Sequence, residues 1–273
     1  MSTWYGEPPP APRPVGWRRV RVLLRGAAAI ALLGAGLLLV VLLRVPERMR
    51  YGLRRPWTGR VARVVMALVV PVLGLRLRRA GAPMRHPGAL VANHASWLDI
   101  FALNACVPVQ FVSKAEVAHW PGIGVLARAA GTLFIRRDPR EAQAQQRAIE
   151  DRIRAGQRLV FFPEGTSSDG RRVLPFKSTL FQAFFTDGLA AAMWLQPVSI
   201  LYHAPRGADP RFYGWWGDMG FGPHLAQVLA WPGGTVELRF HAPLRVQDYP
   251  SRKALAAACE AAVRAGVDQL LSR

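Results

Sequence analysis

Short apolar segments alternate with helical segments from Gly88 onward, and this alternation constrains the fold more than any other feature. The expected strands are residues 89–92, 109–113, 132–136, 158–163, 195–201 and 235–240. The clearest helices are 138–155, which opens with Asp138 as N-cap and Pro139 at the first helical position, and 252–271. Strands of this length separated by helices predict an α/β fold, with a mixed, largely parallel sheet flanked by helices.

An uncharged apolar run covers residues 26–43, with arginines on both sides. Its eighteen residues are about enough to cross a hydrocarbon core. No small-residue cleavage site follows, which argues against a signal peptide. The sequence leaves open whether the run spans the bilayer or lies in its interface. Because the flank after residue 43 is the more basic, we expect the rest of the chain on the cytoplasmic face of the inner membrane, anchored by this segment.

The positive charge of the chain is unevenly distributed. The net charge is +19, and residues 1–85 hold 16 arginines against two acids, Glu7 and Glu47. The remaining residues hold 20 bases against 15 acids and are nearly balanced. Basic residues next to apolar segments indicate an anionic lipid surface as a partner, whereas a nucleic-acid-binding protein is expected to be basic throughout.

Three domains are predicted from these shifts in composition. Residues 1–17 are a Pro-rich, disordered tail, 18–85 are a membrane-associated segment, and 86–273 are the α/β domain. A second apolar run at 64–75 contains Pro71 and Gly74 and favours an interfacial or re-entrant helix, although a core helix is the alternative. Residues 203–233 are expected to form a long functional or membrane-facing loop.

The segment from Leu90 to Asp99 carries the first candidate chemistry. His94 ends an apolar strand, and Asp99 falls in the first turn of a helix expected over 97–104, with Ser96 as its N-cap. A carboxylate on one imidazole nitrogen fixes the tautomer and leaves the other nitrogen to take a proton from a hydroxyl. The alternative is a capping box formed by Ser96 and Asp99 beside an ordinary partly buried histidine.

A second candidate cluster follows the strand expected at 158–163. Glu164 is followed by Gly165, which allows a tight turn, and by the hydroxyl side chains of Thr166 and Ser167. Such a turn suits a polar or anionic headgroup, although a plain strand-to-loop turn is the alternative. Lys177 lies close enough along the chain to pair with a phosphate or with Glu164.

Three expected strands deliver polar residues to the same edge of the sheet. Arg137, like His94 and Glu164, follows the end of a predicted strand, and ligands gather at the carboxyl ends of parallel strands. A solvated strand end is the alternative for Arg137. Pro197 lies inside an apolar strand, which predicts an edge strand or a bulge near the site.

These motifs together resemble the glycerolipid acyltransferase family, typified by 1-acylglycerol-3-phosphate acyltransferase. The resemblance covers about residues 86–245 and rests on four blocks. These are His94 with Asp99, Gly131 with Phe134, Ile135 and Arg137, the F-P-E-G-T segment from Phe162, and Pro197. Ser167 stands where the family usually has an arginine that helps hold the acceptor's phosphate.

The resemblance implies a membrane-bound bacterial enzyme of phospholipid biosynthesis that transfers an acyl chain directly. His94 would deprotonate the acceptor hydroxyl, with Asp99 orienting the imidazole, and acyl-CoA or acyl carrier protein would supply the chain without cofactor or metal. Arg137, Glu164, Gly165, Thr166, Ser167 and Lys177 would bind the acceptor. The expected acceptor is 1-acylglycerol-3-phosphate, giving phosphatidic acid. The alternative is lyso-ornithine lipid, because residues 164–178 also resemble enzymes that acylate this zwitterionic lipid.

Other classes fit the residues less well. A Ser-His-Asp hydrolase needs a Gly-x-Ser-x-Gly elbow, which the chain lacks, and no second histidine lies at metal-ligand spacing from His94. A catalytically inactive membrane adaptor with the same fold stays open. Cys106 and Cys259 form no metal or redox spacing and are expected to be free thiols on helices.

Overall fold

The computed structural model describes residues 6–9, 14–119, 123–135, 139–185 and 190–272. The helices are α1 (Trp17–Tyr51), α2 (Thr58–Val72), α3 (Asp99–Cys106), α4 (Ile123–Ala130), α5 (Ala142–Arg154), α6 (Phe221–Ala230) and α7 (Arg252–Leu271). The strands are β1 (Leu75–Ala80), β2 (Gly88–Ala92), β3 (Gln110–Lys114), β4 (Leu133–Ile135), β5 (Leu159–Phe161), β6 (Trp194–His203), β7 (Gly234–Phe240) and β8 (Leu244–Arg245).

The strands form one eight-stranded sheet in the order β1-β7-β6-β2-β5-β3-β4, with β8 pairing β6. Neighbouring strands from β6 to β4 run parallel, and β1 runs parallel to β7. Only the pairs of β6 with β7 and with β8 are antiparallel among the described strands. The expected mixed, largely parallel sheet is therefore confirmed.

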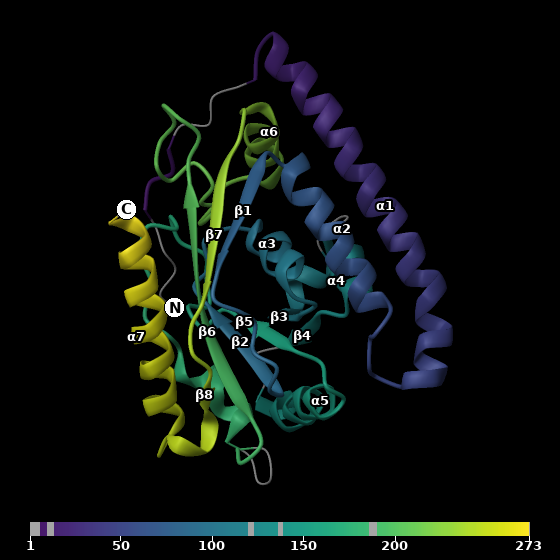
Figure 1. Cartoon of the computed structure of the whole chain (residues 1–273), viewed down its shortest axis with the longest axis vertical. Helices are drawn as coiled ribbons and strands as arrows, with labels where there is room; N and C mark the ends of the chain where they lie inside the picture. Colours follow the sequence, from purple (N-terminus) through teal and green to yellow (C-terminus); the bar gives the residue numbers. More distant parts are fainter. Residues whose placement is uncertain (1–5, 10–13, 120–122, 136–138, 186–189, 273) are drawn as a thin grey trace.

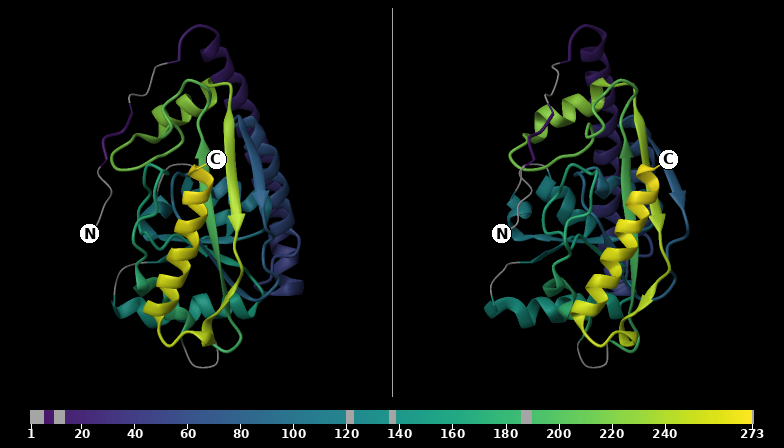
Figure 2. Two further views of the ribbon diagram at one scale, coloured as in Figure 1. Left: turned by 60° about the vertical axis from the view of Figure 1, so that its left-hand side comes forward. Right: turned by 90° about the vertical axis from the view of Figure 1, so that its left-hand side faces the viewer.

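Helices cover both faces of this sheet (Figures 1 and 2). One face, which includes Leu90 and Val160, packs against α2 and α3, while the opposite face, which includes Val91 and Phe161, packs against α5 and α7. Alternate residues of β2 thus enter two different cores, and all five residues of the strand are buried. This explains why β2 is a continuous apolar run rather than an alternating one.

The sheet begins earlier in the chain than residue 86. β1 comes from the segment assigned to the membrane and pairs with β7 from Leu75 to Ala80. Its register places Arg76 opposite Thr235 and Arg78 opposite Glu237, so the strand is rich in arginine and no apolar run marked it. The α/β unit therefore includes residues 75–80.

The α1–α2 hairpin packs along one side of the molecule (Figure 1). α1 is long and apolar enough to cross a membrane by length and composition, and only 11% of its most apolar window is buried. α2 presents Val69 and Val70 to the core, as the core-helix alternative expected, and leaves Val64 and Leu68 exposed. Its interfacial position stays a prediction. A buried carboxylate, Glu47, accepts bonds from the Thr58 amide and hydroxyl and ties the two helices together.

Residues 203–233 are not one long loop, because they contain α6. Arg21 and Arg25 of α1 donate to carbonyls at the α6 C-terminus, over 3.1 Å to Ala230 and 2.6 Å to Trp231. Cations there complement the helix dipole and occupy carbonyls that lack helical partners. The fold of this segment thus depends on arginines two hundred residues away.

Pro197 lies in an interior strand, so the expectation of an edge strand is wrong. The expected irregularity is present, because Gln196 and Pro197 stand opposite three residues, 241–243. The pairing of β6 with β7 starts at Val198, and its pairing with β8 covers only Trp194 and Leu195. The proline therefore falls at an interruption of that ladder, where a missing N–H is tolerated. The Gln196 side chain fills the gap by bonding to Ala82, Met84 and His241.

The remaining elements lie close to their expected positions. Residues 252–271 form α7, and the Ser251 hydroxyl caps it by accepting from the Ala254 amide. Asp138 lies outside the described residues, so its capping role stays a prediction. The thiols Cys106 and Cys259 are free and buried on α3 and α7. Of the expected disordered tail, the described Gly6 and Glu7 contact the 203–233 segment through Trp216 and Arg211.

Candidate active site

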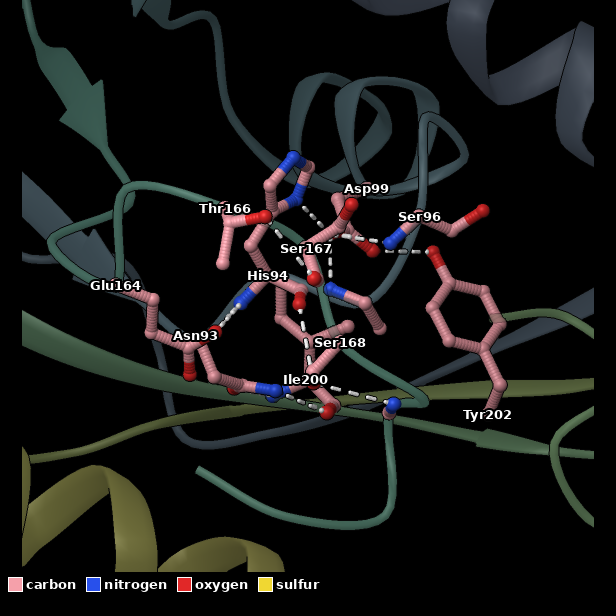
Figure 3. Close-up of polar contacts among 12 residues, drawn as sticks. Asn93, His94, Ser96, Asp99, Glu164, Thr166, Ser167, Ser168, Ile200 and Tyr202 are labelled. Atoms are coloured by element: carbon pink, nitrogen blue, oxygen red, sulfur yellow. Dashed lines mark hydrogen bonds and ion pairs between the residues drawn. The ribbon is translucent and has the colours of Figure 1, made fainter. Parts of the chain in front are cut away.

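His94 and Asp99 meet at the carboxyl end of β2. Nδ1 of His94 lies 2.7 Å from Oδ2 of Asp99 (Figure 3). The main chain leaves the strand after Ala92 and turns into α3, whose first residue is Asp99. An ionised carboxylate only accepts, so Nδ1 carries the proton and Nε2 carries the lone pair. The imidazole is thus held in the tautomer that a general base requires.

The Asp99 carboxylate is completely buried and fully engaged. Oδ2 also accepts from the amides of Ala95 and Ser96 over 2.9 and 3.1 Å, and Oδ1 accepts from the Tyr202 hydroxyl over 2.8 Å. These donors replace the water that burial removes, so the carboxylate is stabilised as an anion. Burial and the neighbouring Asp99 charge raise the pKa of Tyr202 well above its usual range, which keeps its hydroxyl a donor.

The Ser96 side chain does not cap α3. Its hydroxyl is buried without a hydrogen-bond partner among the described residues. The Asp99 side chain instead reaches back to the Ser96 amide, which is the other half of a capping box. The capping interaction and the histidine contact therefore use the same carboxylate. The His94–Asp99 pair and the capping box of Ser96 and Asp99 are thus compatible.

Aromatic and amide side chains fix the surroundings of His94. The Phe162 ring stacks on the imidazole, with centroids 4.1 Å apart and 13° between the planes. The Asn93 side chain exchanges two bonds with the Ile200 main chain, over 2.8 and 2.9 Å, and so ties the end of β2 to β6. The His94 side chain remains 22% exposed, so the imidazole is not sealed off from solvent.

Glu164 comes to the site from the end of β5, beneath the main chain of His94. Its carboxylate is 1% exposed and accepts from the amides of His94 and Leu174 over 3.3 and 3.1 Å. Burial raises its pKa well above the usual range, while the two amide bonds act in the opposite direction. Both oxygens contact protein, and this geometry favours a positioning role over the expected contact with the acceptor.

The turn after Glu164 wraps around the histidine. Gly165 adopts φ 72°, and a Cβ added to it would lie 2.7 Å from Nζ of Lys177, so this lysine is brought onto the turn. The Ser168 amide donates to the His94 carbonyl over 3.0 Å, which places the adjacent Thr166 and Ser167 beside the histidine. Arg137 lies outside the described residues, two positions beyond the end of β4.

The 203–233 segment closes over the same turn. Trp97 Nε1 donates to Nδ1 of His224 over 2.9 Å, and the Trp215 amide donates to the Ala95 carbonyl over 2.9 Å. Burial lowers the pKa of His224 to about 4, so it is neutral at pH 7. The sequence indicated none of Tyr202, Asn93 or His224 as site residues, because each acts through a contact more than a hundred residues away.

Comparison with known proteins agrees with this geometry. The family model described as Acyltransferase matches residues 75–200. The lyso-ornithine lipid O-acyltransferase of Rhodobacter capsulatus is 59% identical over 268 residues, which are 97% of this chain and 97% of that protein. The chain belongs to the glycerolipid acyltransferase family. It is an O-acyltransferase of lipid metabolism. Its long, apolar and largely exposed α1 indicates membrane association.

Two further relatives bear on the acceptor and the fold. The 1-acyl-sn-glycerol-3-phosphate acyltransferase of Neisseria gonorrhoeae is 34% identical over 206 residues, 74% of this chain and 77% of that protein. The crystal structure of the 1-acyl-sn-glycerophosphate acyltransferase of Thermotoga maritima has a TM-score of 0.66 and 23% identity, and the match covers 94% of this chain and 98% of that one. The second likeness concerns the acyltransferase fold alone.

Proposed function

We propose that this acyltransferase is a lyso-ornithine lipid O-acyltransferase, which moves a fatty acyl chain from acyl-CoA or acyl carrier protein to the free hydroxyl of lyso-ornithine lipid. The contact between His94 and Asp99 carries the chemistry. The 59% identity to the Rhodobacter capsulatus enzyme over nearly the whole of both chains supports this acceptor. It replaces the sequence-based expectation of 1-acylglycerol-3-phosphate.

In the proposed reaction, Nε2 of His94 removes the proton from the acceptor hydroxyl as its oxygen attacks the thioester carbonyl. A C–O bond forms, and the C–S bond breaks when the tetrahedral intermediate collapses. The imidazolium then returns the proton to the leaving thiolate, so the enzyme ends unchanged. Asp99 stabilises the imidazolium, and the step needs no cofactor, metal or protein nucleophile.

The other residues position these groups or contact the acceptor. Tyr202 holds Asp99, Asn93 ties the end of β2 to β6, and Glu164 holds the amide of His94. Gly165, Thr166, Ser167 and Lys177 border the turn where a headgroup would lie, and Arg137 completes the proposed acceptor contacts.

Charged residues near the turn bear on the nature of the headgroup. The buried Asp169 pairs with Arg172, with an oxygen and a nitrogen 3.0 Å apart, and Ser167 replaces the arginine usual in the family. The neighbouring Gly170 lies against Ala95, so this ion pair is close to the histidine turn. This ion pair presents charges of both signs near the turn, which is compatible with a headgroup that also carries both charges.

The membrane orientation is also part of the proposal. The arginine-rich flank after the apolar run of α1 supports placing the catalytic domain on the cytoplasmic face. Acyl-CoA and acyl carrier protein are cytoplasmic donors, so this orientation gives the site access to its second substrate.

The test uses purified full-length enzyme with a labelled acyl donor and a panel of lysolipids, with the products identified by mass. We expect product from lyso-ornithine lipid and little from 1-acylglycerol-3-phosphate. Product from 1-acylglycerol-3-phosphate alone would overturn the proposed acceptor and favour the activity named for the Neisseria relative. No product from any acceptor, with either donor, would instead favour an inactive membrane adaptor.

A further inference from the structure

A polar pocket lies between the α1–α2 turn and the starts of β3 and β5. It has a volume of about 250 Å³ and includes four arginines and two glutamines in its lining: Arg54, Arg55, Arg60, Arg158, Gln110 and Gln157. Liquid water occupies about 30 Å³ per molecule, so the pocket has room for a phosphate group with bridging waters.

This pocket is separate from the active site. Gln110 is the first residue of β3, and Arg158 directly precedes β5. His94 and Glu164, by contrast, follow the last residues of β2 and β5. Because these strands are parallel, the pocket and the histidine lie at opposite edges of the sheet. A ligand in the pocket is therefore not the lipid that reacts at His94.

The positive charge of the pocket is only partly compensated within the described residues, since among its arginines Arg55 feels the opposing charge of Glu47. No acid lines it, and none of its four arginines has an ion-pair partner in the described part of the chain. The neighbouring Glu47 is fully buried and already binds Arg44, Trp57 and Thr58. Burial and the charges of Arg44 and Arg152 lower the pKa of Arg55 to about 10. Bringing these cations together costs free energy that a bound anion would offset.

Three buried polar atoms of the pocket residues have no hydrogen-bond partner in the described structure. They are Nε of Arg158 and the amide oxygens Oε1 of Gln110 and Gln157. An unpaired buried polar group costs roughly 1–3 kcal/mol, so such atoms are rarely left without a ligand or water. All three atoms belong to residues that line the pocket, so polar groups without partners lie around it.

We propose that this pocket binds a phosphate group, at a site distinct from that of the reacting lipid. Arginines bind phosphate oxygens through paired, charge-assisted bonds. The phosphate belongs either to an anionic phospholipid headgroup or to a free phosphate. The apolar surface beside it favours the headgroup, since Val45, Met49 and Leu53 are exposed next to the turn. A headgroup held there adds an electrostatic contact between the catalytic domain and an anionic lipid surface.

Two arms of one experiment distinguish the sources, using full-length protein and its Arg158→Gln and Arg60→Gln variants. Arg206→Gln is the matched control, since Arg206 is exposed and does not line the pocket. In the first arm, inorganic phosphate is titrated against chloride at equal ionic strength, and the thermal midpoint in detergent is measured. In the second, binding to phosphatidylcholine vesicles with and without phosphatidylglycerol is measured.

We expect phosphate to raise the midpoint of the wild type and of Arg206→Gln, with affinity about tenfold weaker in either pocket variant. A matching loss of phosphatidylglycerol-dependent vesicle binding identifies the headgroup as the source. If the pocket variants lose affinity for inorganic phosphate but keep phosphatidylglycerol-dependent vesicle binding, the ligand is free phosphate. The proposal is overturned if both pocket variants behave like Arg206→Gln in both arms. Arg60 is exposed, so its variant keeps the test decisive if Arg158→Gln fails to fold.

Discussion

The Tyr202 hydroxyl donates to Oδ1 of Asp99 over 2.8 Å, so a central strand of the sheet anchors the carboxylate that orients His94. Tyr202 belongs to β6, which pairs with β2 and β7 and is among the most buried strands. The proposed base, His94, is thus oriented by Asp99, which is itself held by a buried strand. The following predictions test that arrangement and the packing around it.

Replacing His94 with alanine is expected to remove the general base. Losing a general base typically lowers the rate by ~10²–10⁴. The kcat/KM of His94→Ala with lyso-ornithine lipid should therefore fall by that factor. Initial rates and vesicle co-sedimentation measure activity and membrane binding, and only the first should change. His86→Ala is the control, because His86 is exposed and outside the site. Near wild-type activity of His94→Ala would exclude the mechanism.

Removing the Tyr202 hydroxyl is expected to loosen Asp99 without touching substrate. Tyr202→Phe should lower kcat about tenfold, which corresponds to roughly 1.4 kcal/mol. Because this hydroxyl contacts Asp99 and not the substrate, KM should stay near the wild-type value while kcat falls. Tyr213→Phe is the matched control, because its buried hydroxyl has no hydrogen-bond partner among the described residues. Equal kcat values for Tyr202→Phe and Tyr213→Phe would contradict the positioning role.

His224 is expected to make the fold acid-sensitive. Burial lowers its pKa to about 4, whereas in the unfolded chain it titrates near 6.5. Between these values the unfolded state binds the extra proton, so the free energy of unfolding should fall as the pH drops from 6.5 to 4, by up to about 3 kcal/mol. His224→Asn keeps an acceptor for Trp97 but cannot take up the proton.

Unfolding in detergent measured at several pH values should therefore show a weaker acid dependence for His224→Asn than for the wild type. His86→Asn, at an exposed histidine, is expected to retain the wild-type slope. If the slopes for wild type and His224→Asn coincide, the buried histidine does not control acid stability.

Gly36 is expected to be required where α1 approaches α2. A Cβ added to it would lie 2.7 Å from Cγ2 of Val65, whereas a Cβ at Gly34 meets nothing within 4 Å. Both changes to alanine favour the helix, but overpacking at residue 36 should lower stability by about 1–3 kcal/mol relative to Gly34→Ala. Thermal unfolding in detergent compares the two. Adding Val65→Ala should restore the thermal stability of Gly36→Ala. If it does not, the strain does not come from the contact with Val65.

Much of the site could be anticipated because its signals are local in sequence. His94 and Asp99 are five residues apart, and Glu164 and Gly165 follow a buried strand, so strand ends and spacing predict their meeting at one edge. The role of Glu164 was less predictable. A carboxylate after a strand is compatible with ligand binding, and only the placement of the His94 and Leu174 amides turns it to the main chain.

The elements that sequence analysis missed depend on distant partners. β1 is an arginine-rich strand that is stable because β7 lies alongside it, and α6 is completed by arginines from α1. Hydrophobic periodicity detects burial on a face, but it does not detect hydrogen bonds between segments far apart in the chain.

The sequence by itself determined the α/β class, the apolar arginine-flanked N-terminal segment and the pairing of His94 with Asp99. Each follows from residues a few positions apart, where chain geometry limits the possibilities. Only the tertiary structure decided that Tyr202 supports Asp99, that Glu164 holds the main chain and that four arginines share a pocket opposite the active site. These relationships arise when the sheet brings distant segments together, and their energetics depend on burial, which no local pattern specifies.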